Sequence, residues 1–271
     1  MVKLTREVRF AVRATDDNGD STGGVKVHNS FGGHPSLSGE AIYIRLAITL
    51  AGDLEPRSQY LVNIKAVDDT VRARVVPQFS RLLAGGGLKT DAGWASAVGD
   101  VFVRLRDALP PARVVALELH RSEFFSIGVV AEEPDMVRVS CLFEFSAAHR
   151  LHNPALTEQE NLDTFGKCNN PLGHGHNYQV KVTVRGAGGG GVALPGLERT
   201  VDETLIRYLD HKHLNLEVSE FRDAKDGGGG VIPSVENIAA VAFRRLRNPL
   251  GASLVSVTVW ETPKTWAEFS E

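Results

Sequence analysis

Three histidines and one cysteine in the second half of the chain have the spacing of a metal-dependent active site. His174 and His176 alternate, Cys168 precedes His174 by six residues, and His149 ends an earlier alternating apolar run. Because residues two apart on a strand point to the same face, the two alternating imidazoles project together. Three neutral imidazoles suit a catalytic zinc ion that keeps one position open. The alternative is three unrelated histidines, each partly buried and hydrogen-bonded to the protein.

Two predicted strands must bring these side chains together. Residues 137–145 and residues 178–184 both carry an apolar side chain at every second position. If the two strands pair, the end of the first can place His149 beside the other two imidazoles. Cys141 shares the apolar face of the first strand and is predicted to be a small core residue. Cys168, in contrast, lies in a loop among Gly, Lys, Asn and Pro.

Composition excludes several classes of protein. The chain has 271 residues, of which 42% are hydrophobic and 23% charged, and its formal net charge is −3. This balance gives no general attraction to nucleic acid or to an anionic membrane. We expect a cytoplasmic protein, because no apolar run is long enough to span a bilayer and the first residues lack the apolar core of a signal peptide. The cysteines would then stay reduced.

The chain also aligns with itself. A shift of 134 positions overlays Phe31–His34 on Phe165–Cys168. The same shift overlays Val67–Thr70 on Val201–Thr204, and each of these two segments is predicted to begin a helix. Each half reads strand, strand, helix, helix, strand, strand, which is typical of an α+β domain with an antiparallel sheet. We therefore predict two tandem domains, residues 1–133 and 134–271, each a four-stranded antiparallel sheet with two helices between the strand pairs.

Only the second half carries the candidate ligands. At the same shift, Glu40 and Ile42 of the first half stand where His174 and His176 stand in the second. We therefore predict that the first half is degenerate and binds no metal, and that His34, which aligns with Cys168, takes part in no reaction.

The second half resembles the 6-pyruvoyl-tetrahydropterin synthase family, zinc enzymes of the tunnelling fold. The resemblance covers Val137 to Glu271, and the first half is similar to a degenerate copy of the same fold. Beside the cysteine-to-histidine block, the motifs that carry the resemblance are Phe145–Leu151, Leu209–Asn215, Val235–Asn237 and Trp260–Thr262.

The resemblance implies a role for each motif. The metal ligands would be His149, His174 and His176. Cys168 would be the general base, since a thiolate near Zn²⁺ and a lysine is favoured over the thiol. The catalytic triad would be completed by the pair Asp210 and His211. From the residues alone, that pair reads equally as a solvated helix end.

Two glutamates would contact the substrate. In this family a glutamate near the C-terminus anchors the pterin ring, which implies Glu261, and Glu236 matches a second glutamate of the pocket. Each has a structural alternative: Glu261 can be an exposed carboxylate at a strand end, and Glu236 follows a predicted N-cap, Ser234, where the helix dipole favours an acid. For the triphosphate, the flanking cations Lys167, Arg150 and Lys212 are candidates.

The implied reaction is elimination of triphosphate from 7,8-dihydroneopterin triphosphate. Related tunnelling-fold enzymes make 6-carboxy-tetrahydropterin, a queuosine precursor, from the same substrate, so this product remains an alternative. A non-catalytic pterin-binding protein and a metal-dependent hydrolase are further alternatives. Because family active sites lie where subunits meet, we also expect a homo-oligomer.

Overall fold

The computed structural model describes residues 1–14, 41–187 and 194–271. The segment Phe31–His34 and Glu40, on which part of the predicted repeat rests, lie outside the described residues. Within the described ranges, no helix is both long enough and apolar enough to cross a lipid bilayer.

The chain divides into two units. The first contains residues 1–139 and the described residues 185–187, and the second contains residues 140–184 and 194–271. The predicted boundary at residues 133 and 134 falls in the turn that precedes strand β5 (Met136–His149).

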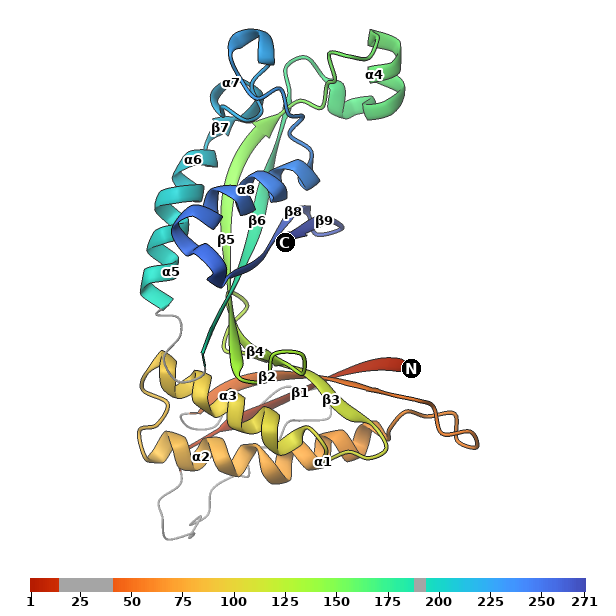
Figure 1. The fold of residues 1–271 in the computed structure, drawn as a ribbon, viewed down its shortest axis with the longest axis vertical. Coiled ribbons are helices and arrows are strands. Elements are labelled where there is room, and N and C mark those ends of the chain that lie inside the picture. Colours follow the sequence, from red (N-terminus) through yellow and green to blue (C-terminus); the bar gives the residue numbers. More distant parts are fainter. Residues whose placement is uncertain (15–40, 188–193) are drawn as a thin grey trace. The chain divides into compact units, whose positions relative to one another are not determined.

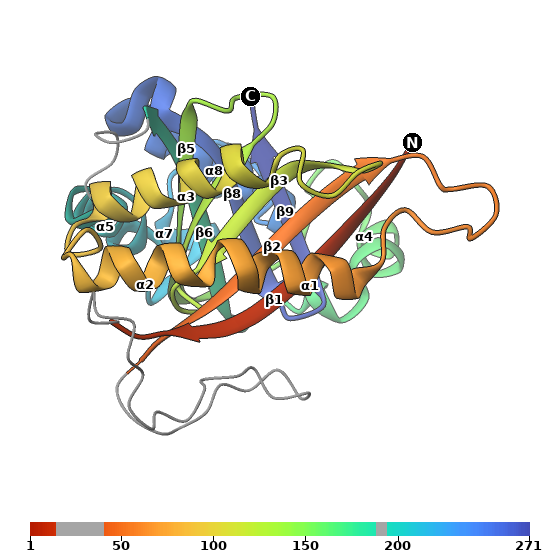
Figure 2. The same cartoon turned by 90° about the horizontal axis from the view of Figure 1, so that it is seen from below.

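Four antiparallel strands form the sheet of the first unit, and the apolar side chains on one face of them are buried. Ile44, Leu46 and Ile48 alternate along the second strand and are fully buried. They belong to one core with apolar side chains of three helices, which lie across one face of the strands (Figure 2). In order of pairing the strands are β1 (Val2–Val12), β2 (Ile42–Gly52), β3 (Arg113–His120) and β4 (Phe125–Val130), and the helices are α1 (Ile64–Arg74), α2 (Val76–Ala84) and α3 (Asp91–Leu105) (Figure 1).

The prediction of two helices is wrong for the first unit, because the first predicted helix is broken in two. α1 ends at Arg74 and α2 begins at Val76. Pro77, at the start of α2, has no N–H to donate to the preceding turn, and its ring restricts the residue before it. A single helix therefore cannot continue through this point.

The second unit is built on long strands that carry the predicted metal ligands. Tyr178, Val180 and Val182 alternate along β6 and are fully buried, as the sequence pattern predicted. Strand β5 ends at His149, and β6 begins at His174. Strands β8 and β9 form an antiparallel hairpin. The strands are β5, β6 (His174–Ala187), β7 (Lys212–His213), which pairs in parallel with β5, β8 (Leu254–Thr262) and β9 (Thr265–Ser270).

The prediction of two separate four-stranded sheets is wrong in one respect. All the described strands belong to one hydrogen-bonded path, β1-β2-β3-β4-β5-β6-β8-β9, with β7 attached to β5. The reason is the length of β5 and β6, which have 14 residues each, so that one end of each strand belongs to the first unit and the rest to the second.

The helices of the second unit are also more numerous than the two predicted. Val201–Thr204 does not head a helix, since α5 begins at Leu194 and continues through a π-helical turn, Asp202–Ile206, into α6. A helix after β5 was missed, although Thr157 and Glu160 form a capping box that signals its start. The helices are α4 (Glu158–Phe165), α5 (Leu194–Val201), α6 (Arg207–Leu209), α7 (Leu214–Glu217) and α8 (Val235–Leu250).

Candidate active site

The ends of β5 and β6 bring the three predicted metal ligands together. His149 Nε2 lies 3.0 Å from His174 Nε2. The ring centroid of His176 is 4.9 Å from that of His174 and 5.2 Å from that of His149. One ligand atom from each imidazole and one carboxylate oxygen of Glu261 all lie within 4.8 Å of one another. We call these four residues the His/Glu cluster.

A backbone carbonyl fixes the tautomer of the buried histidine. His149 is fully buried, and its Nδ1 is 2.7 Å from the carbonyl oxygen of Pro233. Since a carbonyl only accepts, Nδ1 carries a proton, and in the neutral ring Nε2 is then free of one. Such a hydrogen bond behind a ligating imidazole is typical of metal sites, where it orients the ring.

Burial favours the neutral form of His174 and of His176. It lowers the pKa of His174 and of His176, chiefly by removing water from the charged form. His176 Nε2 is buried and has no hydrogen-bond partner among the described residues. Neutral imidazoles with converging nitrogens, one of them unsatisfied, fit a bound metal ion.

Glu261 lies closer to the histidines than the sequence indicated. Its Oε1 is 3.3 Å from His149 Nε2 and 3.6 Å from His176 Nε2. The interaction with His149, ahead of the charge interaction with His176, lowers the pKa of the Glu261 carboxyl. The register of β6 and β8 explains the placement, because Gln179 pairs with Trp260 and so Glu261 falls next to the buried end of β6.

Cys168 lies beside the cluster but is not a member of it. It sits in a 3-10 turn, Gly166–Asn169, and is partly exposed. The backbone N–H of Leu151 donates to the Cys168 carbonyl over 2.9 Å. The cysteine loop is therefore held against the chain two residues beyond the ligand His149.

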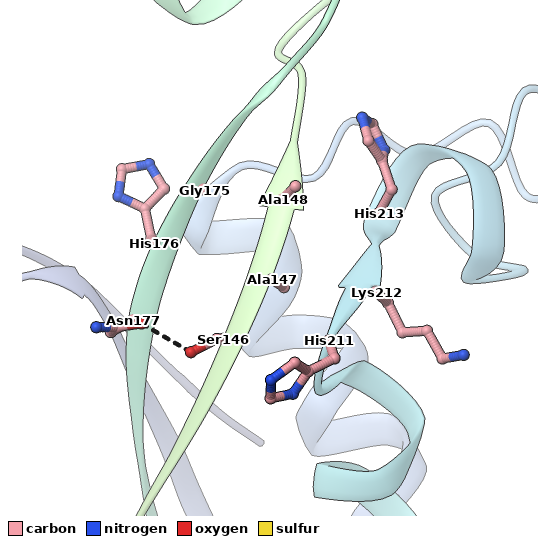
Figure 3. Close-up of a pocket in the computed structure, with 9 residues that line it drawn as sticks. All are labelled: Ser146, Ala147, Ala148, Gly175, His176, Asn177, His211, Lys212 and His213. Carbon is pink, nitrogen blue, oxygen red and sulfur yellow. Dashed lines mark hydrogen bonds between the residues drawn. The ribbon is translucent and has the colours of Figure 1, made fainter.

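Asp210 and His211 form the predicted pair, but it lies on a different side of the strands from the metal ligands. His211 Nδ1 is 2.8 Å from Asp210 Oδ2, and the backbone N–H of Ser146 donates to Asp210 Oδ1 over 2.8 Å. The His211 side chain is 83% exposed. It lines a groove of about 480 Å³, and in Figure 3 strands β5 and β6 lie between its ring and that of His176.

Two residues that line this groove point away from the metal ligands. Ser146 Oγ donates to Asn177 Oδ1 over 2.7 Å across β5 and β6. Both residues alternate with the metal ligands along their strands, so they point to the opposite face. The groove lining consists of Ser146, Ala147, Ala148, Gly175, His176, Asn177, His211, Lys212 and His213.

The remaining predicted contacts lie outside the His/Glu cluster. Glu236 is exposed in the first turn of α8, and Ser234 caps that helix by accepting from Asn237 N–H. Among the triphosphate candidates, Arg150 donates through Nε to Asn169, and Lys212 pairs with Glu217 at 3.3 Å.

Sequence reasoning missed a polar group next to the cluster. Tyr178 was assigned to the core, and its ring is fully buried and stacked on Phe145 at a centroid distance of 4.8 Å. Its hydroxyl, however, is also buried and has no partner among the described residues. Burial, with the nearby charges of Glu261 and Cys168, raises the pKa of this phenol far above its usual value. It therefore remains protonated and available as a donor.

Comparison with known proteins decides the family. Residues 138–271 match the family model described as 6-pyruvoyl tetrahydropterin synthase. The human 6-pyruvoyl tetrahydrobiopterin synthase is 42% identical over 131 residues, which are 46% of this chain and 85% of the human protein. This chain belongs to the 6-pyruvoyl tetrahydropterin synthase family.

Two more distant matches carry the names of two different enzymes. A solved structure of 6-pyruvoyl tetrahydropterin synthase from Caenorhabditis elegans is 34% identical, covers 50% of this chain and 96% of that one, and has a TM-score of 0.46. The 6-carboxy-5,6,7,8-tetrahydropterin synthase of Haemophilus influenzae is 26% identical over 153 residues, 50% of this chain and 100% of that protein. The 6-pyruvoyl tetrahydropterin synthase family model covers every residue of the His/Glu cluster, Cys168, Asp210 and His211.

Removing the Tyr178 hydroxyl should stabilise the metal-free protein. A buried hydroxyl without a partner costs about 1 to 3 kcal/mol, so Tyr178→Phe should raise the free energy of unfolding by about 1 kcal/mol. Denaturant unfolding in the presence of a chelator measures this. A loss of stability would show that the hydroxyl has a partner in solution.

The Asp210 carboxylate should contribute stability that depends on pH. The pKa of Asp210 is lowered, chiefly by the hydrogen bond from the Ser146 N–H. Burial opposes this shift in part, and the hydrogen bond with His211 adds to it. A lowered pKa in the folded state means stability that is fully present above the unfolded pKa of about 3.9 and lost as pH falls through the folded value. Wild type should therefore exceed Asp210→Asn in stability by a constant amount above about pH 5, and this difference should shrink below about pH 4. Urea unfolding across this range tests it; a difference that grows toward low pH would contradict it.

Proposed function

We propose that this chain is a zinc-dependent lyase that eliminates triphosphate from 7,8-dihydroneopterin triphosphate, as a 6-pyruvoyl-tetrahydropterin synthase. The observation that carries the proposal is the convergence of three imidazoles and one carboxylate in the His/Glu cluster. Family membership supports it, since several relatives at about 40% identity bear the name of this activity.

His149, His174 and His176 would hold the zinc, which when bound acts as a Lewis acid toward the substrate's side-chain hydroxyls. Cys168, on the loop beside His149, would accept the carbon-bound proton as a thiolate. The C–O bond to triphosphate then breaks, and triphosphate leaves with the bonding electron pair.

Glu261 would serve the pterin ring once zinc is in place. Without metal, its carboxylate faces His149 Nε2 at 3.3 Å. With zinc held by the three histidines, the carboxylate would be available to accept hydrogen bonds from the amidine-like edge of a pterin. Glu236 is the second proposed pterin contact.

Incubation of the purified protein with 7,8-dihydroneopterin triphosphate tests the function. We expect triphosphate release without acetaldehyde, together with about one zinc per chain, as one complete set of three histidines implies. Acetaldehyde would instead identify a 6-carboxy-tetrahydropterin synthase, and pterin binding without triphosphate release would identify a binding protein. Product formation by water attack, with the carbon-bound proton retained, would identify a hydrolase.

The chain provides a matched pair of cysteine variants for this assay. Cys168→Ala should lower kcat by about 10²- to 10⁴-fold, the usual contribution of a general base. Cys141 is 4% exposed in the core, and Cys141→Ala should leave kcat within about threefold of wild type, because it lies on β5 eight residues before the ligand His149. Equal losses in both variants would remove Cys168 from the mechanism.

We further propose that the chain is a tandem duplication, with a degenerate first domain (residues 1–133) and a catalytic second domain (134–271). Corresponding strands support it: β1 and β5 begin at residues 2 and 136, and β4 and β9 each have six residues, beginning at 125 and 265. Within the described residues, the one cluster able to hold a metal ion belongs to the second domain. Ile42, at the position of His176, opens β2 without a ligand.

The separation of His211 from the metal ligands supports a homo-oligomer. His211 is exposed, and strands β5 and β6 lie between its ring and that of His176 (Figure 3). We propose that the Asp210 and His211 pair of one chain completes the site formed by Cys168 and the metal ligands of another.

Mixed oligomers test this arrangement. Cys168→Ala and His211→Ala chains should each be inactive, but co-expression should restore about one quarter of the wild-type rate, the chance that a site draws both groups from intact chains. No recovery in verified mixed oligomers, or a fully active wild-type monomer by light scattering, would contradict the proposal.

A further inference from the structure

A buried asparagine follows the proposed base directly. Asn169 is 8% exposed, although it lies in the short 3-10 turn that also carries Cys168. A buried amide needs partners, because leaving its polar atoms unsatisfied costs free energy. The partners of this side chain show what it does.

All of these partners come from the three residues after the metal ligand His149. Arg150 Nε is 3.1 Å and His152 Nδ1 is 3.0 Å from Asn169 Oδ1. An amide oxygen only accepts, so both nitrogens donate to it. Arg150 Nε also donates to the Asn169 carbonyl over 3.0 Å. With the Leu151 bond to the Cys168 carbonyl, the segment 150–152 holds the cysteine turn at several points.

The other end of the cysteine loop is held against the same strand end. Gly173 has φ +73°, and a Cβ there would lie 3.0 Å from the carbonyl oxygen of His149 and 2.8 Å from His213 Nε2. Only glycine fits this close approach in this conformation. The loop from Cys168 to Gly173 thus has little freedom to move relative to His149.

The neighbouring asparagine is different. Asn170 is exposed, and its side chain bonds only within its own loop, accepting from Leu172 N–H and donating to the Gly173 carbonyl. Among the described residues, it makes no hydrogen bond with the segment after His149. Asn169 therefore links the cysteine loop to the segment after His149, whereas Asn170 makes contacts only within the loop. The two residues are a matched pair for mutation.

We infer that Asn169 is a positioning residue for the reaction: through Arg150 and His152 it holds the Cys168 thiol at a fixed place relative to the metal ligand His149. The inference rests on the proposed function of Cys168 as the base. Proton transfer requires the base within hydrogen-bond reach of the proton it takes, and a displacement of about 1 Å can cost about 10²-fold in rate.

Steady-state kinetics of the zinc-loaded enzyme give the first test. Asn169→Ala should lower kcat by about 10- to 100-fold while KM changes by less than about threefold, because the change moves the base and leaves the substrate contacts in place. Asn169→Asp keeps an acceptor oxygen for Arg150 and His152 and should recover at least about tenfold of that loss. The control Asn170→Ala should stay within about threefold of wild type.

Alkylation of Cys168 gives a second reading that does not need activity. The chain has two cysteines, and Cys141 is buried, so iodoacetamide labelling of the folded protein reports on Cys168. Asn169→Ala should be labelled at least about threefold faster than wild type and Asn169→Asp at nearly the wild-type rate, since accessibility controls the reaction once the thiolate fraction is equal. Zinc content, measured in each variant, should be unchanged.

Several outcomes overturn the inference. An Asn169→Ala protein with wild-type kcat and wild-type labelling does so, and so does an Asn169→Asp protein that folds, binds zinc and behaves like Asn169→Ala. Should Asn169→Ala fail to fold, His152→Phe, which removes one donor from the other side, must reproduce faster labelling. If wild type releases no triphosphate, the proposed function fails, while the labelling comparison still decides the positioning role.

Discussion

The hydrogen bond from His149 Nδ1 to the Pro233 carbonyl is the constraint on which the metal-facing end of the second unit depends. It joins the end of β5 to the segment that precedes α8, and it leaves Nε2 of a fully buried imidazole as the atom that faces the other ligands. The geometry of the cluster is therefore set by a backbone atom distant in sequence as much as by the histidines themselves.

Strand alternation divides the chemistry between two faces. Along β5 and β6, the imidazoles and the apolar core side chains occupy alternate positions. Ser146 and Asn177 occupy the positions between them and line the groove beside His211. This alternation is why Ser146 and Asn177, although close to the metal ligands in sequence, point to the opposite face of their strands.

Local patterns predicted the main strands and the faces to which the histidines point, and long-range pairings were what they could not supply. The alternation of Tyr178, Val180 and Val182 identified β6 and put two imidazoles on one face, because the period of a strand is a local property. The nearness of Glu261 to the cluster depends on the register of β6 with β8, which no local pattern contains. The break before Pro77 and the capping box at Thr157 were readable but were overlooked. The partners of Asn169 could not be read, because a buried amide in a Gly- and Asn-containing turn looks like any other loop residue.

His211 is one of the few described residues other than glycine with a positive φ, +57°. This conformation costs a residue with a Cβ about 1 to 2 kcal/mol relative to glycine. Its backbone N–H donates to the Ser146 carbonyl over 2.6 Å, so the turn is held by the main chain and does not need the imidazole. At this one position, conformational stability and the Asp-His pair make opposite demands on the side chain. Glycine would suit the turn better, so a histidine at this position gives up conformational stability and in return places an imidazole beside Asp210.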